Sequence, residues 1–393
     1  MNVDVAIVGA GPAGLCLARA LSGHGLSVAL IEQQAAEALY SPGFDGREIA
    51  LTQASKAELM RLGIWQGLAP EEVSALRDAR VFNGPSDFSL DIEAHQAGEL
   101  QLGYLVPNHA IRREAFAAAM ACPDVRLLES CTLREVQQQD GAVELSLSTG
   151  VSLRARLLVA ADSRFSDTRR RLGIGAKMKD FGKTMLVCRM QHERDHEHVA
   201  WEWFGYGQTL AMLPLNGGQA SLVLTLPQHE IARLMALDEA SFSAEMRTRI
   251  DSRLGAMELV SSRHSYPLVG VFPDRLYSQR AALVGDAAVG MHPVTAHGFN
   301  FGLQSQRRLA DLVIKAQQQG ADIGASHLLQ SYDRNQRLAS WPLYQATNWV
   351  VGLYTNDHLA VRVLRNATLR VAQRLSPLRR VIAKHLSQPP VMR

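Results

Sequence analysis

The N-terminal part of the chain contains two short apolar runs, and a glycine-rich turn follows the first of them. Residues 4–8 and 27–31 are mainly apolar and are of the kind that forms buried parallel strands. Between them, Leu15, Ala18 and Leu21 recur at the spacing that places side chains on one face of a helix. The pattern therefore predicts a strand, a turn, a helix and a second strand, which ends at Glu32.

The turn between the first strand and the helix contains three glycines. Gly9 allows a tight turn, Gly11 lets backbone approach a pyrophosphate, and Gly14 lets the helix pack closely on the strand. The helix N-terminus offers free N–H groups to phosphates, and Glu32 can accept hydrogen bonds from both hydroxyls of an adenosine ribose. This order predicts a dinucleotide site without separating NAD from FAD. A turn without any ligand would not explain the acid that ends the second strand.

Two later segments place polar residues where a flavin nucleotide could meet them. Residues 45–51 put Arg47 directly after a glycine, at the start of a predicted helical stretch. Residues 155–162 form a predicted strand that ends at Asp162. Ligands bind at the carboxyl ends of strands in open α/β sheets, so Asp162 is a candidate ligand contact. A helix N-cap is the alternative role for this residue.

A third segment favours FAD most specifically. A predicted strand at residues 280–284 delivers Gly285 and Asp286 to the edge of the sheet. Asp286 could accept a hydrogen bond from a polyol such as ribityl. The long helix that starts near Gly298 could direct its N-terminus at the flavin pyrimidine edge, where negative charge develops on reduction.

The middle and the C-terminal part of the chain differ in pattern. Alternating strands are expected between Lys183 and Leu226, and their aromatic residues either line a substrate pocket or pack as core: Trp201, Trp203, Phe204 and Tyr206. From about Leu328 the pattern predicts helices, which we expect Pro342 and Pro377 to interrupt.

Composition limits the function classes. The 393 residues are 47% hydrophobic with a formal net charge of +3, which allows two domains and does not indicate a nucleic-acid partner. The cysteines show neither pairing nor metal-ligand spacing, so we expect no metal site and four reduced core thiols: Cys16, Cys122, Cys131 and Cys188.

Charge is uneven at the C-terminal end. No acidic residue follows Asp357, whereas seven arginines and one lysine do. Such a segment suits an anionic membrane surface, an acidic partner or a biosynthetic complex, and the alternative is a solvated helix face. The first strand begins close to Met1, which leaves no room for a signal peptide, and no apolar run is long enough to span a bilayer. We therefore expect a cytoplasmic protein whose membrane contact, if any, is peripheral to the inner membrane face.

Taken in order, these motifs resemble the class A FAD-dependent aromatic monooxygenases of the para-hydroxybenzoate hydroxylase type. The resemblance covers nearly the whole chain and rests on the following residues: Gly9–Gly14, Glu32, Gly46-Arg47, Asp162, Gly285-Asp286, His292-Pro293, Gly298 and Asn300. Further segments are similar to the ubiquinone-biosynthesis hydroxylases within that class: residues 45–51, 210–215, 221–223, 353–357, 364–366 and 375–379.

The resemblance implies an α/β fold in which a Rossmann-type FAD-binding domain is interleaved with a mixed β-sheet substrate domain and followed by C-terminal helices. The implied FAD-binding domain comprises residues 1–71, 103–176 and 269–327, the substrate domain residues 72–102 and 177–268, and the helical segment residues 328–393.

The resemblance also implies the residues that contact the cofactor. Gly9, Gly11, Ala13 and Gly14 would meet the pyrophosphate and Glu32 the ribose, while the remaining contacts would be made by Arg47, Asn108, Leu133, Asp162, Gly285, Asp286, Pro293, Gly298, Phe299 and Asn300. This chain departs from the family at residues 295–298, where His297 replaces an expected glutamine. His297 is a candidate substrate contact or proton carrier, and the alternative is a structural histidine under the loop.

The implied reaction is hydroxylation of the aromatic ring of a polyprenylated ubiquinone precursor, with O2 and a reductant such as NAD(P)H. Ring carbon 5 is the expected position, alone or among several. Two alternatives stay open: a flavin-dependent reductase of a prenyl substrate, and a non-catalytic flavoprotein subunit of a quinone-biosynthesis assembly.

Overall fold

The N-terminal unit is built on a largely parallel sheet. In the computed structural model, which describes residues 1–205, 207–291, 298–355 and 359–387, β1 (Asn2–Val8) lies between β2 (Val28–Ile31) and β11 (Ser152–Ala160) and parallel to both. The sheet continues on both sides through β8 (Val125–Leu128), β19 (Ala281–Leu283), β18 (Tyr277–Ser278), β10 (Val143–Leu147) and β9 (Leu133–Gln138).

Burial explains why the first strands and helix form. All four residues of β2 are buried, as are the last four of β1. On α1 (Pro12–Leu21) the buried side includes Leu15, Ala18 and Leu21, as their spacing predicts. This helix packs against α8 (Gly298–Gln318) and α4 (Asn108–Met120), so the glycine turn is held between covered elements.

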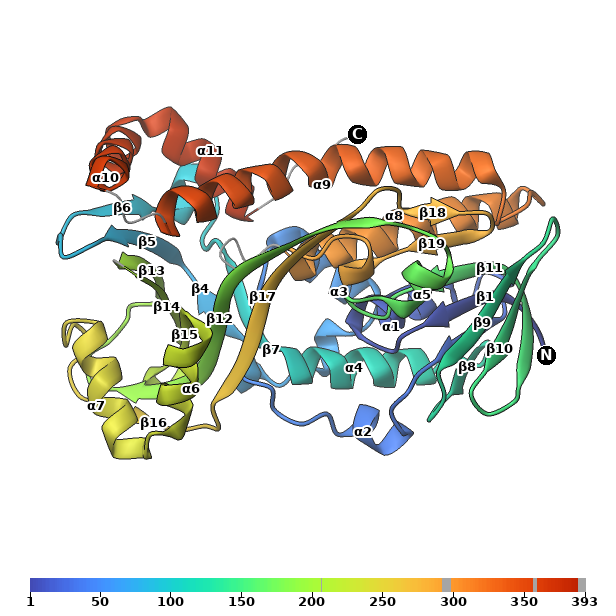
Figure 1. The fold of residues 1–393 in the computed structure, drawn as a ribbon, viewed down its shortest axis with the longest axis horizontal. Helices are drawn as coiled ribbons and strands as arrows, with labels where there is room; N and C mark the ends of the chain where they lie inside the picture. Colours follow the sequence, from blue (N-terminus) through green and yellow to red (C-terminus); the bar gives the residue numbers. More distant parts are fainter. Residues whose placement is uncertain (206, 292–297, 356–358, 388–393) are drawn as a thin grey trace.

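The second sheet is mixed and is drawn from separate parts of the chain. Its strands lie in the order β16 (Met257–Leu259), β12 (Ala176–His192), β15 (Gln219–Leu226), β14 (Gln208–Leu215), β13 (Val199–Gly205), β5 (Asp78–Asn83) and β6 (Ser89–Ile92), and β17 (His264–Pro273) pairs with β12. The long strands β12 and β17 reach from this sheet toward the first one (Figure 1). The expected strands between Lys183 and Leu226 are confirmed, whereas the exact domain boundaries stay a prediction.

One face of the second sheet is a closed apolar core. Residues that alternate along its strands, such as Trp203, Leu210 and Leu222, are buried together with Phe242 and Met246 of the neighbouring helices. The covering helices are α6 (Gln228–Ala236) and α7 (Glu239–Arg249). The opposite face packs against the C-terminal helices at β5 and β6 and is left for the site along the other strands.

A small third sheet and the remaining helices join the two main sheets. β7 (Gly103–Pro107) lies between β3 (Glu48–Leu51) and β4 (Ser74–Leu76). The other helices are α2 (Ala36–Tyr40), α3 (Gln53–Arg61), α5 (Asp167–Arg171), α9 (Ser326–Thr355), α10 (Leu359–Arg374) and α11 (Ser376–Ser387). In Figure 1, α9 runs along one side of the molecule, and α10 and α11 lie beside β6.

The prediction that a helix starts within residues 45–51 is wrong. Residues Glu48–Leu51 form β3, which pairs antiparallel with β7, and the helix begins only at Gln53. Its N-cap is Thr52, whose side chain accepts a hydrogen bond from the backbone N–H of Ser55. The pairing partner lies more than fifty residues further along the chain, so no local pattern reveals it.

The expected interruption at Pro342 is also wrong, because α9 continues through this residue. Contacts on both sides of the proline hold the helix: the Tyr332 hydroxyl donates to the Leu283 carbonyl at 2.6 Å, and Tyr344 packs on Phe272. The break at Pro377 is confirmed, since this residue lies in the first turn of α11, where a missing N–H costs no helical hydrogen bond. The four cysteines are buried and unpaired, as expected.

Candidate functional site

A cavity of about 970 Å³ connects the glycine turn to the open face of the second sheet. Most of the predicted site residues line it together, although they come from distant parts of the chain: Gly9, Gly11, Ala13, Glu32, Arg47, Asn108, Leu133, Asp162, Gly285, Asp286, Gly298 and Phe299. Pro293 and His297 lie outside the described residues. Gly14 and Asn300 are described but do not line the cavity.

The glycine turn has the shape that a pyrophosphate needs. Gly9 has a φ of +105°, and a Cβ added there would lie 2.6 Å from the Ala161 carbonyl oxygen. A Cβ on Gly14 would lie 2.0 Å from the Gly9 oxygen, so Gly14 allows the close packing of helix and turn. A Cβ on Gly11 would instead meet nothing within 4 Å. Open space thus lies where a phosphate would approach the start of α1, and the turn fits a dinucleotide.

Glu32 connects the turn to the cavity. One carboxylate oxygen accepts the backbone N–H of Ala10 at 2.7 Å, and the other accepts that of Gln34 at 3.0 Å. These bonds fix the carboxylate at the end of β2, where it still lines the cavity, as Leu133 also does. The remaining lone pairs could accept ribose hydroxyl groups.

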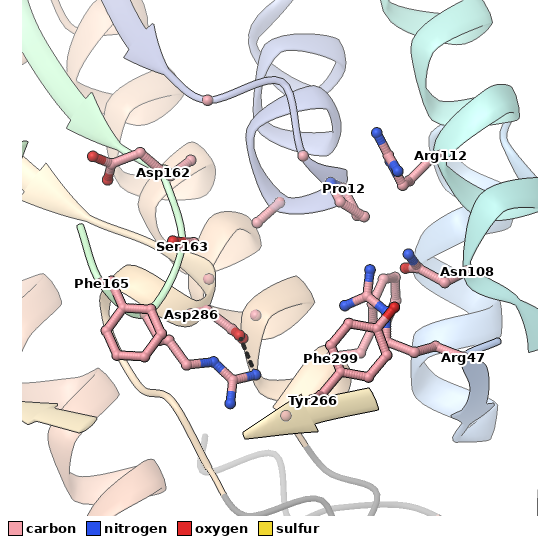
Figure 2. A pocket seen from close by; sticks show the side chains of 18 of the residues that line it. Pro12, Arg47, Asn108, Arg112, Asp162, Ser163, Phe165, Tyr266, Asp286 and Phe299 are labelled. Atoms are coloured by element: carbon pink, nitrogen blue, oxygen red, sulfur yellow. Dashed lines mark hydrogen bonds and ion pairs between the residues drawn. The ribbon is translucent and has the colours of Figure 1, made fainter. Parts of the chain in front are cut away.

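Arg47 belongs to a cluster at the other side of the cavity, which Figure 2 shows with Asn108 and Tyr266. Its guanidinium donates to Asp45 at 2.5 Å, and the Asn108 amide donates to the same carboxylate at 2.8 Å. Burial alone would raise the pKa of Asp45, but the hydrogen bonds and charge of Arg47 and the Asn108 amide lower it. Tyr266 closes the cluster by donating to the Asp45 carbonyl at 2.7 Å.

Asp162 and Asp286 approach the cavity from neighbouring strand ends, as predicted. Asp162 accepts the Ser166 hydroxyl and the backbone N–H of Thr168 at 3.0 Å, so it also organises the start of α5. Asp286 accepts from Arg164 at 3.1 Å (dashed in Figure 2). Both roles considered for Asp162, ligand contact and helix capping, are therefore compatible with its position.

The start of α8 completes the wall. Gly298 and Phe299 line the cavity, and a Cβ on Gly302 would lie 3.3 Å from the Gly285 Cα, which brings helix and turn close together. Asn300 makes other contacts than predicted. Its amide donates to the Ala50 carbonyl at 2.8 Å and accepts from the Thr52 N–H at 3.2 Å. Its side chain thus ties α8 to the end of β3.

The second sheet supplies a mostly apolar wall: Met185, Val187, Ala211, Leu213, Val223 and Leu268, with Thr209, Thr225 and Glu202 among them. The aromatic residues considered as pocket lining, Trp201, Trp203 and Phe204, do not line it; Trp203 is core, and its indole donates to the Gly84 carbonyl at 2.8 Å. Tyr206 lies outside the described residues.

Several residues that line the cavity were not predicted from the sequence, among them Arg112, Arg164, Glu202 and Tyr266. Only Glu202 carried a usable signal. In a strand with a period of two, the residue between two core tryptophans must face the other way.

The fold and the cavity define a flavin-dependent protein. The chain matches the FAD binding domain family over residues 2–347 and belongs to that family. Within it, the chain belongs to the FAD-dependent aromatic monooxygenases, and FAD is its cofactor, as the sequence predicted.

Among its relatives, ubiquinone hydroxylase UbiM of Neisseria meningitidis is 45% identical over 391 residues, which cover 98% of this chain and 85% of that protein. Ubiquinone hydroxylase UbiL of Rhodospirillum rubrum is 36% identical, covering 97% and 89%. The 3-demethoxyubiquinol 3-hydroxylase of Escherichia coli is 28% identical and covers 97% of both chains.

Solved structures share the fold. The p-nitrophenol 4-monooxygenase PnpA of Pseudomonas putida superposes with a TM-score of 0.79 at 18% identity, covering 99% of this chain and 100% of that one. A PqsL mutant of P. aeruginosa gives a TM-score of 0.76 at 22% identity, covering 96% and 99%. The expected fold class is thereby confirmed.

Proposed function

We propose that this chain hydroxylates the aromatic ring of a polyprenylated ubiquinone precursor, using O2 and NAD(P)H. The observation that carries the proposal is the single cavity that joins a dinucleotide cradle to the apolar wall of the second sheet. A ring held against that wall would lie next to the predicted flavin end of the cradle. The names of the relatives, ubiquinone hydroxylases and a demethoxyubiquinol hydroxylase, support this class of substrate.

The predicted cofactor contacts are part of the proposal. Bound FAD would accept reducing equivalents from NAD(P)H and activate O2. The chain would hold its pyrophosphate at Gly11 and the start of α1, its adenosine ribose at Glu32, and its ribityl chain at Asp286. Arg112 lines the cavity and would offset the phosphate charge, whereas the lining residues Arg47 and Arg164 are paired with Asp45 and Asp286.

The second sheet would orient the substrate and exclude water. Its wall is apolar apart from two threonines and one glutamate, which suits a ring with an isoprenoid tail. Water exclusion matters because it protects reactive oxygen chemistry from side reactions. We propose ring carbon 5 as the position hydroxylated, alone or among several.

We further propose that α10 and α11 bring the protein to a membrane surface, where a polyprenylated substrate would reside. Exposed apolar and cationic side chains alternate on these helices and at Leu375 between them: Arg370, Val371, Arg374, Leu375, Arg380, Val381 and Lys384. Basic residues near an anionic leaflet each contribute about 1 kcal/mol to membrane binding. Within the described residues, no helix is both long and apolar enough to cross a bilayer, so the proposed contact is peripheral.

The ring position is tested by the quinone profile of a strain that lacks this protein. Accumulation of a precursor without the carbon 5 oxygen supports the proposal, and restoration by the intact gene is the control. Accumulation of a compound that lacks oxygen only at another ring position would contradict it.

A further inference from the structure

One carboxyl group lies on the substrate wall of the cavity. Glu202 sits in β13 between Trp201 and Trp203, and strand alternation turns it away from the tryptophan core. Other acids line the cavity only from outside this sheet, and Glu48 among them is paired with Arg189 of β12: Glu32, Glu48, Asp162, Asp167 and Asp286. Among the described residues of the second sheet, Glu202 alone brings a carboxyl to the cavity.

The surroundings of Glu202 are apolar and uncharged. It lies opposite Ala211 of β14 and Val81 of β5, and Ala211 in turn lies opposite Val223 of β15. Opposed side chains in a sheet are about 5 Å apart, so these aliphatic groups flank the carboxyl. The polar side chains nearest along the same face are Asn83 of β5 and Thr209 of β14, which both lie opposite Phe204, and Thr225 of β15. The two threonines also line the cavity.

No hydrogen bond or ion pair joins the Glu202 carboxyl to another group in the described part of the chain. The side chain is half-buried, and a carboxyl among apolar groups normally has a partner, because leaving it without one is costly. The carboxyl therefore has the position and the free bonding capacity to meet a group brought in by a ligand.

The charged side chains on the elements packed against β13 do not act as partners of the Glu202 carboxyl. Arg80 and Asp78 of β5 lie one and three residues before Val81 and so face the opposite side of the sheet. On the cavity face, Arg189 of β12 is paired with Glu48, and β17 carries His264 and Tyr266. On helix α10, Arg365 is buried one turn before Leu369, and Leu369 packs with Phe204 of β13.

The pKa of the Glu202 carboxyl is raised to about 8. Burial alone is the cause, with no contribution from a neighbouring charge.

We propose that Glu202 is a catalytic residue that accepts the proton of a ring hydroxyl on the substrate. In this step the substrate O–H bond breaks, its electron pair stays on the ring oxygen, and the proton forms a new O–H bond on the Glu202 carboxylate. No group is oxidised or reduced in the step. The resulting phenolate is more electron-rich and more readily attacked by an electrophilic oxygen. This role rests on the proposed hydroxylation.

The pH dependence follows from the same group. Glu202 must be ionised to accept a proton, so product formation should rise with pH and level off above about 8. A carboxylate with this pKa is also a far stronger base than an ordinary glutamate. At neutral pH only a minor fraction of the Glu202 carboxyl is ionised, because the apolar surroundings disfavour its charged form.

The test compares Glu202→Gln with the wild-type protein carrying FAD. Glu258→Gln is the matched control, because Glu258 is exposed on β16 of the same sheet. Loss of a general base should lower product formation by about 10²- to 10⁴-fold and remove the rise with pH. The Michaelis constant for the phenol should change little. Glu202→Asp keeps a carboxyl and should retain the rise with pH at a reduced rate, and it covers the case in which the glutamine variant does not fold.

A second readout does not depend on turnover. The absorbance of a bound prenylated phenol distinguishes its neutral and ionised forms, and the wild type and Glu258→Gln should bind it ionised at lower pH than Glu202→Gln does. If the wild type binds and ionises the phenol without hydroxylating it, the proposed function fails while the role of Glu202 stands. Equal rates and pH profiles for the wild type and Glu202→Gln, or equal ionisation of the bound phenol, would overturn the role of Glu202.

Discussion

Arg164 donates to Asp286 at 3.1 Å and thereby ties the loop after β11 to the turn after β19. These neighbouring parallel strands end at the same edge of the first sheet, so both residues reach one side of the cavity. The pair holds the Asp286 carboxylate where we propose that it accepts a ribityl hydroxyl.

Replacing Asp286 should weaken FAD binding without unfolding the protein. A hydrogen bond to a charged group contributes about 1.5 to 3 kcal/mol, so Asp286→Asn should lower FAD affinity by about 10- to 100-fold. Fluorescence titration of the apoprotein with FAD measures this. Asp87→Asn is the control, because Asp87 is 96% exposed and also pairs with an arginine, Arg253. Unchanged FAD affinity in Asp286→Asn would remove Asp286 from the proposed site.

Two glycines of the turn should respond differently to the same substitution. Gly11→Ala adds a methyl group to open space, so the melting temperature of the apoprotein should stay near that of the wild type while FAD affinity falls. Gly14→Ala places its methyl group 2.0 Å from the Gly9 oxygen, so it should lower the melting temperature directly. Calorimetry of the apoproteins and FAD titration separate the two effects. Full FAD affinity in Gly11→Ala would contradict the proposed pyrophosphate position.

Glu48 should make stability depend on pH. Burial, opposed by the charge and hydrogen bond of Arg189, raises its pKa from 4.5 to about 7. The folded protein thus retains a proton that the unfolded chain releases, and the free energy of unfolding should fall as pH rises from about 4.5 to 7. Glu48→Gln should flatten this part of the curve, by a few kcal/mol at most. Denaturant unfolding across this range measures the change, with Glu258→Gln as control. Glu202 acts in the same direction up to about pH 8, whereas the lowered pKa values of His109 and His192 act in the opposite direction. A Glu48→Gln curve with the same slope as the wild-type curve would therefore contradict the assignment to Glu48.

The cations of α10 and α11 should govern membrane binding. Changing Arg374, Arg380 and Lys384 to glutamine should lower association with anionic vesicles by up to about 3 kcal/mol, or about 100-fold, and should not alter FAD content. Vesicle co-sedimentation measures this, and neutral vesicles should show little binding by either form. A variant with three exposed cations changed elsewhere, at Arg134, Lys177 and Lys315, is the control. Equal losses in the two variants would mean that only net charge matters.

The local parts of the site could be predicted from the sequence. The strand, glycine turn and helix around Gly11 follow from short-range pattern, as do the strand ends at Asp162 and Asp286. Long-range pairing could not be predicted in the same way. Glu48–Leu51 forms a strand only because β7 pairs with it, and Tyr266 reaches Asp45 from more than two hundred residues away.

Glu202 shows most clearly which part of the site cannot be predicted from the sequence. The tryptophans on either side of it draw attention as pocket residues, yet they face the core. Which face of the sheet is covered depends on α6 and α7, and these helices follow β13 in the chain. The alternation is visible in the sequence, but the direction of the cavity is not.

The most direct test of the account is a single turnover of the purified protein with isotopically labelled O2, NAD(P)H and a polyprenylated phenol, analysed by mass spectrometry. We expect one labelled oxygen atom on the ring of the product and no product without O2. A product with a reduced prenyl chain and no label would identify a reductase, and a flavin-loaded protein that forms no product would identify an assembly subunit. Either result would contradict the proposed hydroxylation.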